Sequence, residues 1–100
     1  MSARVFWDVR AQNDLAMIVD YIAFDQQSPQ NDELLLDMIQ NKIELYATSP
    51  LLGEIRNDLG PELRIFSVHS IVVVYAVIPS GIVIERVIHA ARDFPRLFGK

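Results

Sequence analysis

Four arginines and one histidine in the second half of the chain have side chains suited to chemistry on a charged ligand: Arg56, Arg64, Arg86, His89 and Arg92. A guanidinium binds phosphate through two parallel hydrogen bonds, and an imidazole can transfer a proton near neutral pH. The strands expected below bring these residues toward one region of a sheet. We therefore take all five as target-binding candidates. If the chain is a nuclease, Arg64, Arg86 and His89 are its catalytic candidates.

Structural ion pairs are the alternative use of the same arginines, and we weigh it at least equally, because RNA cleavage needs both a base and an acid near the scissile phosphate. Each arginine has an acidic neighbour one or two positions away, namely Asp58 for Arg56, Glu62 for Arg64, Glu85 for Arg86 and Asp93 for Arg92. The sequence has no glycine-rich phosphate loop, nucleophile elbow or metal-ligand spacing. We therefore expect no metal site and no cofactor.

Length and composition indicate a single domain over residues 1–100. Hydrophobic residues make up 51% of the chain, with 4 Gly and 5 Pro, and no apolar run approaches the ~18 residues of a membrane span. The first ten residues lack the basic start and apolar core of a secretory signal, and there are 0 cysteines. These features predict a soluble, cytoplasmic protein with no membrane contact.

Charge is unevenly distributed along the chain. Nine acidic and three basic residues precede Arg56, whereas four acidic and six basic residues lie from Arg56 onward. The basic half suits contact with an acidic partner. With a net charge of -4, however, the whole chain is too acidic for us to expect direct DNA binding.

The most apolar run, residues 71–78, predicts the middle one of three consecutive antiparallel strands. It lies between two turn signals, His69-Ser70 and Pro79-Ser80-Gly81. Alternation divides its side chains into Val72, Val74 and Ala76 on one face and Val73, Tyr75 and Val77 on the other. In the next strand the same rule places Ile82, Ile84 and Ile88 opposite Val83 and Val87. Both faces of the middle strand are apolar, so we expect both to be buried.

The first half of the chain predicts a short strand and two helices. Alternating apolar residues indicate a strand over residues 5–10. Asn13 is a suitable cap for a helix that runs to about Asp25, and Ser28-Pro29 marks the start of a second helix that ends near Thr48. The predicted fold class is thus α+β, with a short N-terminal strand, an antiparallel two-helix hairpin and a three-stranded antiparallel sheet.

A two-helix hairpin can cover only one face of this sheet. The other face would then be an apolar surface, which is typical of a protein interface, so we infer a partner, for example a segment that folds as it binds. Two alternatives remain open. In the first alternative the first strand and the tail cover the patch, since residues 90–100 are expected to fold back onto the sheet edge. In the second, a second copy of the chain covers it in a homodimer. Residues 51–61 are expected to form a loop.

The order of these features resembles the ParE branch of the RelE/ParE toxin superfamily over almost the whole chain. The residues that carry the resemblance in the helical half are Asp14-Leu15, Ile18, Tyr21-Ile22-Ala23, Ser28-Pro29 and Ser49-Pro50. Those in the sheet half are Gly53, Arg56-Asn57-Asp58-Leu59, Leu63-Arg64, Val74-Tyr75 and the segment from Glu85 to Asp93. The two most specific pieces are residues 56–64 and the closing Arg-Val-Ile-His-Ala-Ala-Arg-Asp.

The resemblance implies a toxin of a type II toxin-antitoxin pair, neutralised in a hetero-oligomer by a ParD-like antitoxin that wraps over the toxin and supplies the missing cover. In such pairs the antitoxin, not the toxin, carries the DNA-binding domain. The antitoxin-binding candidates are apolar or aromatic side chains assigned to the helix and the open sheet face, namely Tyr21, Phe66, Val73, Tyr75 and Val77.

Two activities occur among similar toxins: inhibition of DNA gyrase by trapping its covalent complex with cleaved DNA, and ribosome-dependent cleavage of mRNA. RelE-like nucleases carry lysines and arginines around the sheet centre and a tyrosine or its equivalent near the C-terminus. Here the only lysines are Lys42 and Lys100, Ala76 follows Tyr75 where many relatives have arginine, and the tail has no tyrosine. The sequence therefore favours a non-enzymatic gyrase inhibitor. An mRNA endonuclease and an inactive antitoxin-binding relative are the alternatives.

Overall fold

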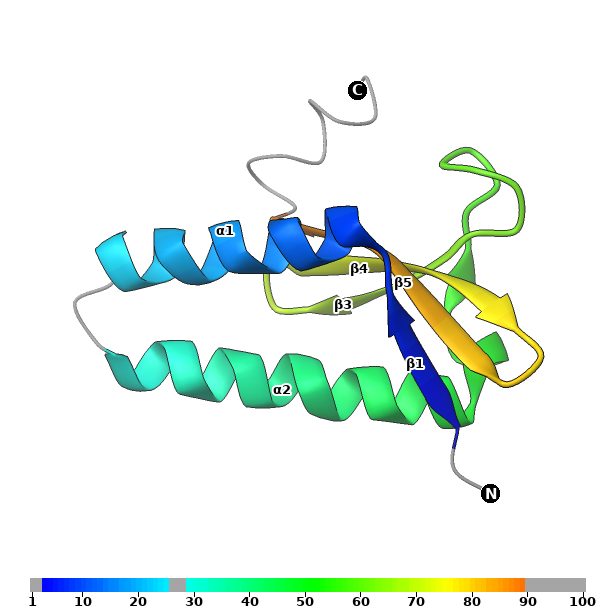
Figure 1. Ribbon diagram of the computed structural model, residues 1–100, viewed down its shortest axis with the longest axis horizontal. Coiled ribbons are helices and arrows are strands. Elements are labelled where there is room, and N and C mark those ends of the chain that lie inside the picture. The colour runs from blue at the N-terminus through cyan, green and yellow to red at the C-terminus, as the bar shows by residue number, and fades with distance from the viewer. Residues whose placement is uncertain (1–2, 26–28, 90–100) are drawn as a thin grey trace.

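A strand, two long helices and a series of strands follow one another along the chain (Figure 1). The computed structural model describes residues 3–25 and 29–89, and the side chains of 3–20 and 34–89. The elements are β1 (Arg4–Trp7), α1 (Val9–Asp25), α2 (Pro29–Thr48), the short 3-10 helix η1 (Pro50–Leu52), β2 (Glu54–Ile55), β3 (Arg64–Val68), β4 (Ile71–Ile78) and β5 (Gly81–His89).

All five strands form one mixed sheet in the order β1-β5-β4-β3-β2. β1 runs parallel to β5, and the other neighbours are antiparallel. The predicted α+β class is confirmed, but the predicted three-stranded antiparallel sheet is wrong. The predicted sheet lacked two strands. These are β1, which joins the sheet through a long-range parallel pairing, and β2, which lies in the segment expected to be a loop.

Gly81 is needed where β1 meets β5. Its φ is +156°, and a Cβ at this position would lie 1.9 Å from the carbonyl oxygen of Arg4. Arg4 and Gly81 are partners in the parallel pairing, and the Arg4 N–H donates to the Ser80 carbonyl at 2.9 Å. A side chain at residue 81 would therefore push β1 out of the sheet.

The first helix begins earlier than its sequence predicts. The Asp8 carboxylate accepts the Arg10 backbone N–H at 2.8 Å, which is the geometry of an N-cap, and α1 starts at Val9. Arg10 also donates to this carboxylate, and these hydrogen bonds lower the pKa of Asp8. Asn13 is thus one turn inside the helix and does not cap it. The predicted start of the second helix at Pro29 is confirmed.

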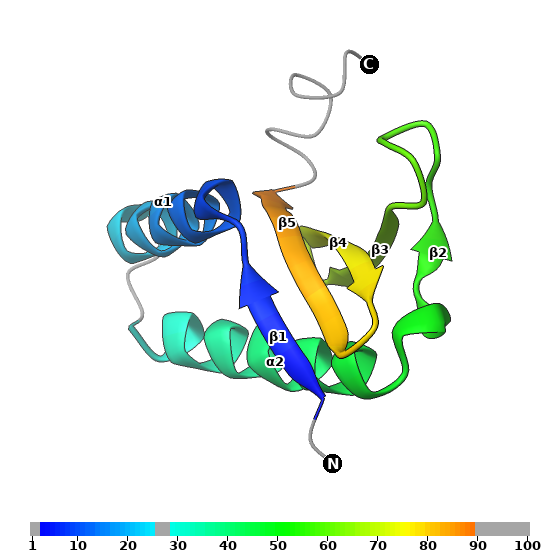
Figure 2. The same cartoon turned by 45° about the vertical axis from the view of Figure 1, so that its right-hand side comes forward.

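Both helices pack on the same face of the sheet, which we call the inner face (Figure 2). The main hydrophobic core lies between them and joins α1, α2 and the strands: Ala11, Ile18, Ile39, Ile43, Ala47, Phe66, Val68, Ile71, Val73, Tyr75, Ile82, Ile84 and Val87. The ring of Tyr46 stacks on Phe66, with centroids 4.3 Å apart. One apolar stripe on each helix thus accounts for the cover of the inner face.

The opposite face, the outer face, has a smaller core. Val72, Val74 and Ile88 are buried there, and Leu59, Leu63 and Ile65 pack against them. Leu59 and Leu63 belong to the loop of residues 56–63 between β2 and β3, so the chain itself covers part of this face. As predicted, β4 is buried on both faces, since all of its first five residues, 71–75, are buried.

A β-bulge in β5 changes which residues share a face. Val74 is paired with Arg86 but Tyr75 is paired with Ile84, so Glu85 is the extra residue. Beyond the bulge the alternation is reversed: Val87 lies in the main core and Ile88 lies on the outer face. The prediction that grouped Ile88 with Ile84 is therefore wrong.

Candidate functional site

The predicted cluster of basic residues is divided between the two faces of the sheet. Directly paired residues of antiparallel strands share a face, so Arg64 lies on the face of Tyr75 and Arg86 on the face of Val74. Tyr75 belongs to the main core and Val74 to the outer core. Arg64 and Arg86 therefore project from opposite faces and do not form one site.

Arg86 joins the sheet to the first helix through a two-pronged ion pair with Asp14. Its Nε donates to one carboxylate oxygen at 2.7 Å and its Nη2 to the other at 3.0 Å. Asp14 also accepts the backbone N–H of Val87 at 3.0 Å, just beyond the bulge. The side chains of Arg86 and Asp14 are only 22% and 15% exposed. This pair therefore fixes α1 against β5, and the ion pair predicted with Glu85 is not the one that forms.

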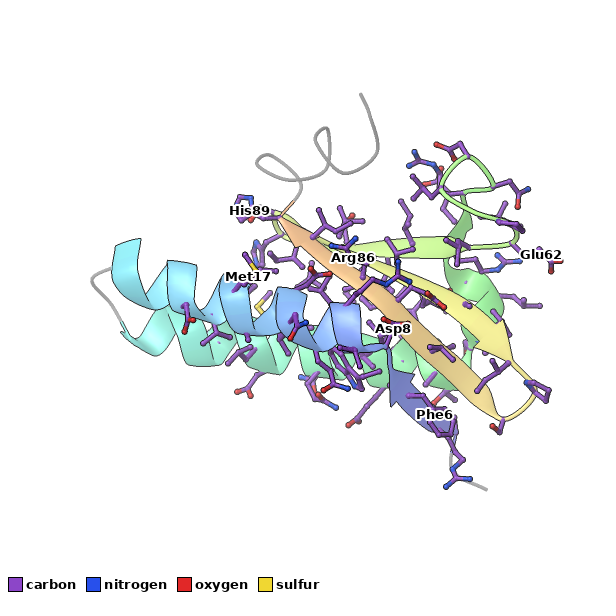
Figure 3. The ribbon with its side chains drawn as sticks, turned by 45° about the horizontal axis from the view of Figure 1, so that its top comes forward. Phe6, Asp8, Met17, Glu62, Arg86 and His89 are labelled. Carbon is purple, nitrogen blue, oxygen red and sulfur yellow. The ribbon has the colours of Figure 1, made fainter. Side chains whose placement is uncertain are left out.

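Glu85 instead accepts a hydrogen bond from Arg10 Nη2 at 3.2 Å. Arg10 also contacts Asp8, so the start of α1 is tied to the bulge by charged groups that lie at the surface. Figure 3 shows Arg86 and His89 along β5, with Asp8 close to Arg86 and Glu62 on the distant loop. Exposed pairs of this kind contribute little stability.

Arg64 and Tyr75 hold the segment between α2 and β2. Arg64 Nη1 donates to the carbonyl oxygens of Gly53 at 2.7 Å and Leu51 at 3.2 Å. The Tyr75 hydroxyl donates to the Pro50 carbonyl at 2.5 Å and accepts the Gly53 N–H at 3.0 Å. A Cβ on residue 53 would lie 2.1 Å from this hydroxyl, so the position requires glycine. The predicted Arg64–Glu62 pair is thus replaced by hydrogen bonds to backbone carbonyls.

Burial raises the pKa of the Tyr75 phenol, an effect that the nearby Gly53 N–H and Arg64 partly offset. The phenol is thus kept neutral, as its donation to Pro50 requires. Tyr75 acts here as a structural hydrogen-bonding group between β4 and residues 50–53.

Arg56 forms the local ion pair that its spacing predicts. Its Nε and Nη2 donate to the two oxygens of Asp58 at 2.8 and 2.7 Å. These hydrogen bonds raise the pKa of Arg56 and lower that of Asp58. Asn57 Oδ1 accepts the Glu62 N–H at 2.8 Å, which closes the loop at a residue with a φ of 60°. The loop over the outer face is therefore held by its own polar groups.

The remaining basic candidates lie at the end of β5. His89, the last residue of that strand, pairs with Ile71 across the ladder and is partly buried. Arg92 lies outside the described residues, as does its expected pairing with Asp93 and the expected course of residues 90–100.

Three of the antitoxin-binding candidates lie in the interior. Phe66, Val73 and Tyr75 are buried beneath the helices in the main core. Val77 is the described candidate that reaches the surface, with 40% of its area exposed. The side chain of Tyr21 lies outside the described part. A partner bound to the folded chain would therefore meet Val77, but not the three core residues.

An exposed apolar surface surrounds Val77, and it includes residues that sequence reasoning assigned only to a loop. Leu51, Leu52 and Ile55 are 71%, 62% and 46% exposed. A cavity of about 420 Å³ lies among Leu51, Ile55, Pro61, Glu62, Arg64, Ala76 and Val77. We call Leu51, Leu52, Ile55 and Val77 the apolar rim. The run Pro50-Leu51-Leu52 could have pointed to it, because consecutive apolar residues in a segment expected to be a loop form an apolar surface patch.

Among the described residues, no group of three or more His, Cys, Asp or Glu is placed to hold a metal ion. Within that same part of the chain, no helix is long and apolar enough to cross a membrane.

Comparison with known proteins decides the family. Residues 5–94 match the family model described as "ParE toxin of type II toxin-antitoxin system, parDE". The chain belongs to the ParE toxin family. It is therefore the toxin component of a type II toxin-antitoxin system, and the resemblance noted in the sequence is confirmed.

A solved structure has the same fold as this chain. It is the "Chromosomal ParDE TA system from P. aeruginosa", with a TM-score of 0.71 and 20% sequence identity. The alignment covers 89% of this ParE-family chain and 95% of the other. No curated protein matches the chain. At this identity the neighbour supports the fold and carries no residue roles.

Proposed function

We propose that this ParE-family toxin inhibits DNA gyrase by trapping its covalent complex with cleaved DNA. The observation that supports this best is that Arg64 and Arg86 lie on opposite faces, each bonded to groups of its own fold. A nuclease needs an acid and a base at one phosphate, whereas a gyrase inhibitor needs only a binding surface. This target would place the toxin's action in the cytoplasm.

The partner that neutralises the toxin is, in this proposal, a ParD-like antitoxin. The family description and the neighbour's name both refer to a ParDE pair. The apolar rim is the proposed contact on the toxin, because it combines exposed leucine, isoleucine and valine side chains around a cavity. Arg64 supports this surface from below by bonding the carbonyl of Leu51. Arg56 and His89 stay candidates for contact with the target.

The test of the target uses purified toxin with gyrase, supercoiled plasmid and ATP, followed by detergent and protease. We expect linear DNA that forms only when gyrase is present and that disappears when antitoxin is added. A toxin that is folded and bound by antitoxin but yields no linear DNA would contradict the proposal. Cleavage of mRNA on ribosomes by the same preparation would instead establish a nuclease.

His89→Gln separates the two activities in the same assay. A gyrase inhibitor does not use the imidazole as an acid or base, so we expect this variant to keep its activity if it folds. A loss of ribosome-dependent cleavage in His89→Gln would identify an enzyme.

Val77→Asp tests the antitoxin surface. A charge placed in an apolar interface is costly, so we expect antitoxin affinity to fall at least about tenfold while the toxin stays folded. Ser67→Asp, at an exposed position of β3, is the matched control. Equal affinity of the two variants would exclude the apolar rim. Val73 and Tyr75 are unsuitable for this test, because a charge at either would disrupt the core.

A further inference from the structure

The second helix carries an apolar stripe that its own fold does not use. Leu34, Met38 and Leu45 are 61%, 38% and 49% exposed, although Ile39 and Ile43 of the same helix are buried. At 100° per residue, the exposed stripe is centred on the side of α2 opposite to the core-facing residues. One stripe is enough to pack a helix on a sheet, so this second stripe is available for another molecule.

The spacing along this stripe is that of a coiled-coil seam. With the exposed Asn41, the positions 34, 38, 41 and 45 are separated by four, three and four residues, the alternation of a and d positions in a heptad. On one side of the seam lie the exposed carboxylates Asp37 and Glu44, and on the other lies Lys42. The helix thus has a short seam with charges of opposite sign on its two flanks.

We propose that this seam is a self-association surface, on which α2 of one toxin packs in parallel against α2 of a second copy around a two-fold axis. Parallel pairing places each seam residue against the same residue of the second copy. The seam then has four layers, formed by the pairs of Leu34, Met38, Asn41 and Leu45. Asn41 can hydrogen-bond to its counterpart across the seam, because each amide has two N–H donors and one carbonyl acceptor.

The flanking charges select the parallel arrangement. In this heptad Met38 and Leu45 are a positions, Asp37 is a g position and Lys42 is an e position. In a parallel pair, a residue at position g of one helix meets position e of the next heptad on the other helix. Asp37 therefore faces Lys42 of the second copy, and the two-fold axis makes this pair twice. An antiparallel pair that stacks Leu34 on Leu45 of the second copy places Met38 against Asn41 and brings Asp37 close to Glu44. That arrangement brings acidic groups together and leaves Asn41 without an amide opposite it.

The inference goes beyond the proposed function, because the seam lies on α2 and requires neither gyrase nor antitoxin. Four layers form a short contact, so we expect a weak dimer that dissociates on dilution. Since the chain has 0 cysteines, single cysteines can report the geometry without background.

The first arm of the test is disulfide cross-linking of purified toxin. Asn41→Cys should form a cross-linked dimer by itself, because facing seam positions on helices about 8–10 Å apart lie within disulfide reach. Gln40→Cys, exposed on α2 but outside the seam, should not. Cross-linking only in a mixture of Asn41→Cys with Met38→Cys would show antiparallel pairing and overturn the proposal. Absence of any seam cross-link would overturn it as well.

The second arm is sedimentation of the cysteine-free chain over a range of concentrations. Lys42→Glu should weaken the dimer about tenfold, because it places a glutamate opposite Asp37 of the other copy in both symmetry-related pairs. The exchange Asp37→Lys with Lys42→Asp should restore it, since it reverses every pair without removing one. Leu45→Ser should abolish it. A toxin that is monomeric at all concentrations, or a dimer insensitive to these charges, would refute the self-association surface.

Discussion

The two faces of the sheet are enclosed by different means. Helices of 17 and 20 residues cover the inner face and enclose most of the core, whereas the loop of residues 56–63 covers the outer face with Leu59 and Leu63. Helices satisfy their own backbone hydrogen bonds as they cover a surface. This loop makes only a few backbone hydrogen bonds and also relies on a side chain, because Asn57 Oδ1 accepts the Glu62 N–H. The inner face should therefore hold the fold, and the outer face should tolerate more change.

Arginines have a different role on each face. Arg86 extends from the outer face and pairs with Asp14 at the edge of β5, which ties the sheet to α1, while on the inner side Arg64 bonds carbonyl groups beneath the apolar rim. In both places the guanidinium lies where a sheet face meets another element. The arginines that suggested chemistry therefore join parts of the fold.

Matched alanine substitutions in β5 test the difference between the faces. Ile84 and Ile88 belong to one strand and are both almost fully buried, but Ile84 is on the inner face and Ile88 on the outer. We expect Ile84→Ala to lower the free energy of unfolding by about 4 kcal/mol and Ile88→Ala by about 2 kcal/mol, since a loop can collapse onto a cavity more readily than two helices can. Urea denaturation measures both. A loss for Ile88→Ala that equals that of Ile84→Ala would show that the loop encloses its face as tightly as the helices do.

The two arginine–aspartate pairs provide a second comparison. Asp14→Asn removes the charge that compensates Arg86 in a mostly buried pair, so we expect a loss of about 2–3 kcal/mol. Asp58→Asn should change stability little, because Asp58 is 62% exposed and solvent screens its pair with Arg56. Urea denaturation at low and high salt measures the loss of unfolding free energy in each variant. A larger loss for Asp58→Asn would mean that the outer loop, not the α1–β5 contact, limits stability.

Local signals predicted what is local in this fold. The turns at residues 69–70 and 79–81 separate β3, β4 and β5 as expected, and Pro29 marks the start of α2. The Arg56–Asp58 pair was predictable for the same reason, because its partners are two residues apart. Sequence spacing is informative when the backbone between two groups is short and its conformation is signalled by proline, glycine or a turn.

Long-range features were not predictable in the same way. The partner of Arg86 is 72 residues away, on a helix, and β1 joins the sheet at the far edge from β2. The bulge at Glu85 has no signal in the sequence, yet it exchanges the faces of Val87 and Ile88. Period-two alternation assumes an unbroken ladder, so one inserted residue reverses every assignment that follows it.

The same limit explains the antitoxin-binding candidates. Alternation correctly grouped Val73, Tyr75 and Val77 on one face, since Val77 pairs with the core residue Ile82, but it cannot say which face the helices cover. That choice depends on the hand and packing of the whole hairpin. The candidates were therefore assigned to the open face, and the structure places the first two beneath the helices.

The Tyr75 hydroxyl, at the margin of the inner face, provides the test with the smallest expected loss of stability. Tyr75→Phe keeps the ring in the core but removes the hydroxyl between Pro50 and Gly53, leaving a carbonyl and an N–H without this partner. We expect a loss of about 1–2 kcal/mol and faster hydrogen exchange at the Gly53 amide. Unchanged exchange at Gly53 would show that the hydroxyl does not hold the segment below the apolar rim.

The pH dependence of this loss gives the variant a second readout. Because burial raises the pKa of Tyr75, the folded chain holds the phenol proton more tightly than the unfolded chain does. The contribution is complete below the usual tyrosine pKa of about 10 and declines as the pH rises above it, since the unfolded chain then ionises first. The stability difference between the original chain and Tyr75→Phe should therefore be constant near neutral pH and shrink above about pH 10. A difference that stays constant to about pH 11 would mean that the phenol titrates as it does in water and that its burial does not govern the hydrogen bond to Pro50.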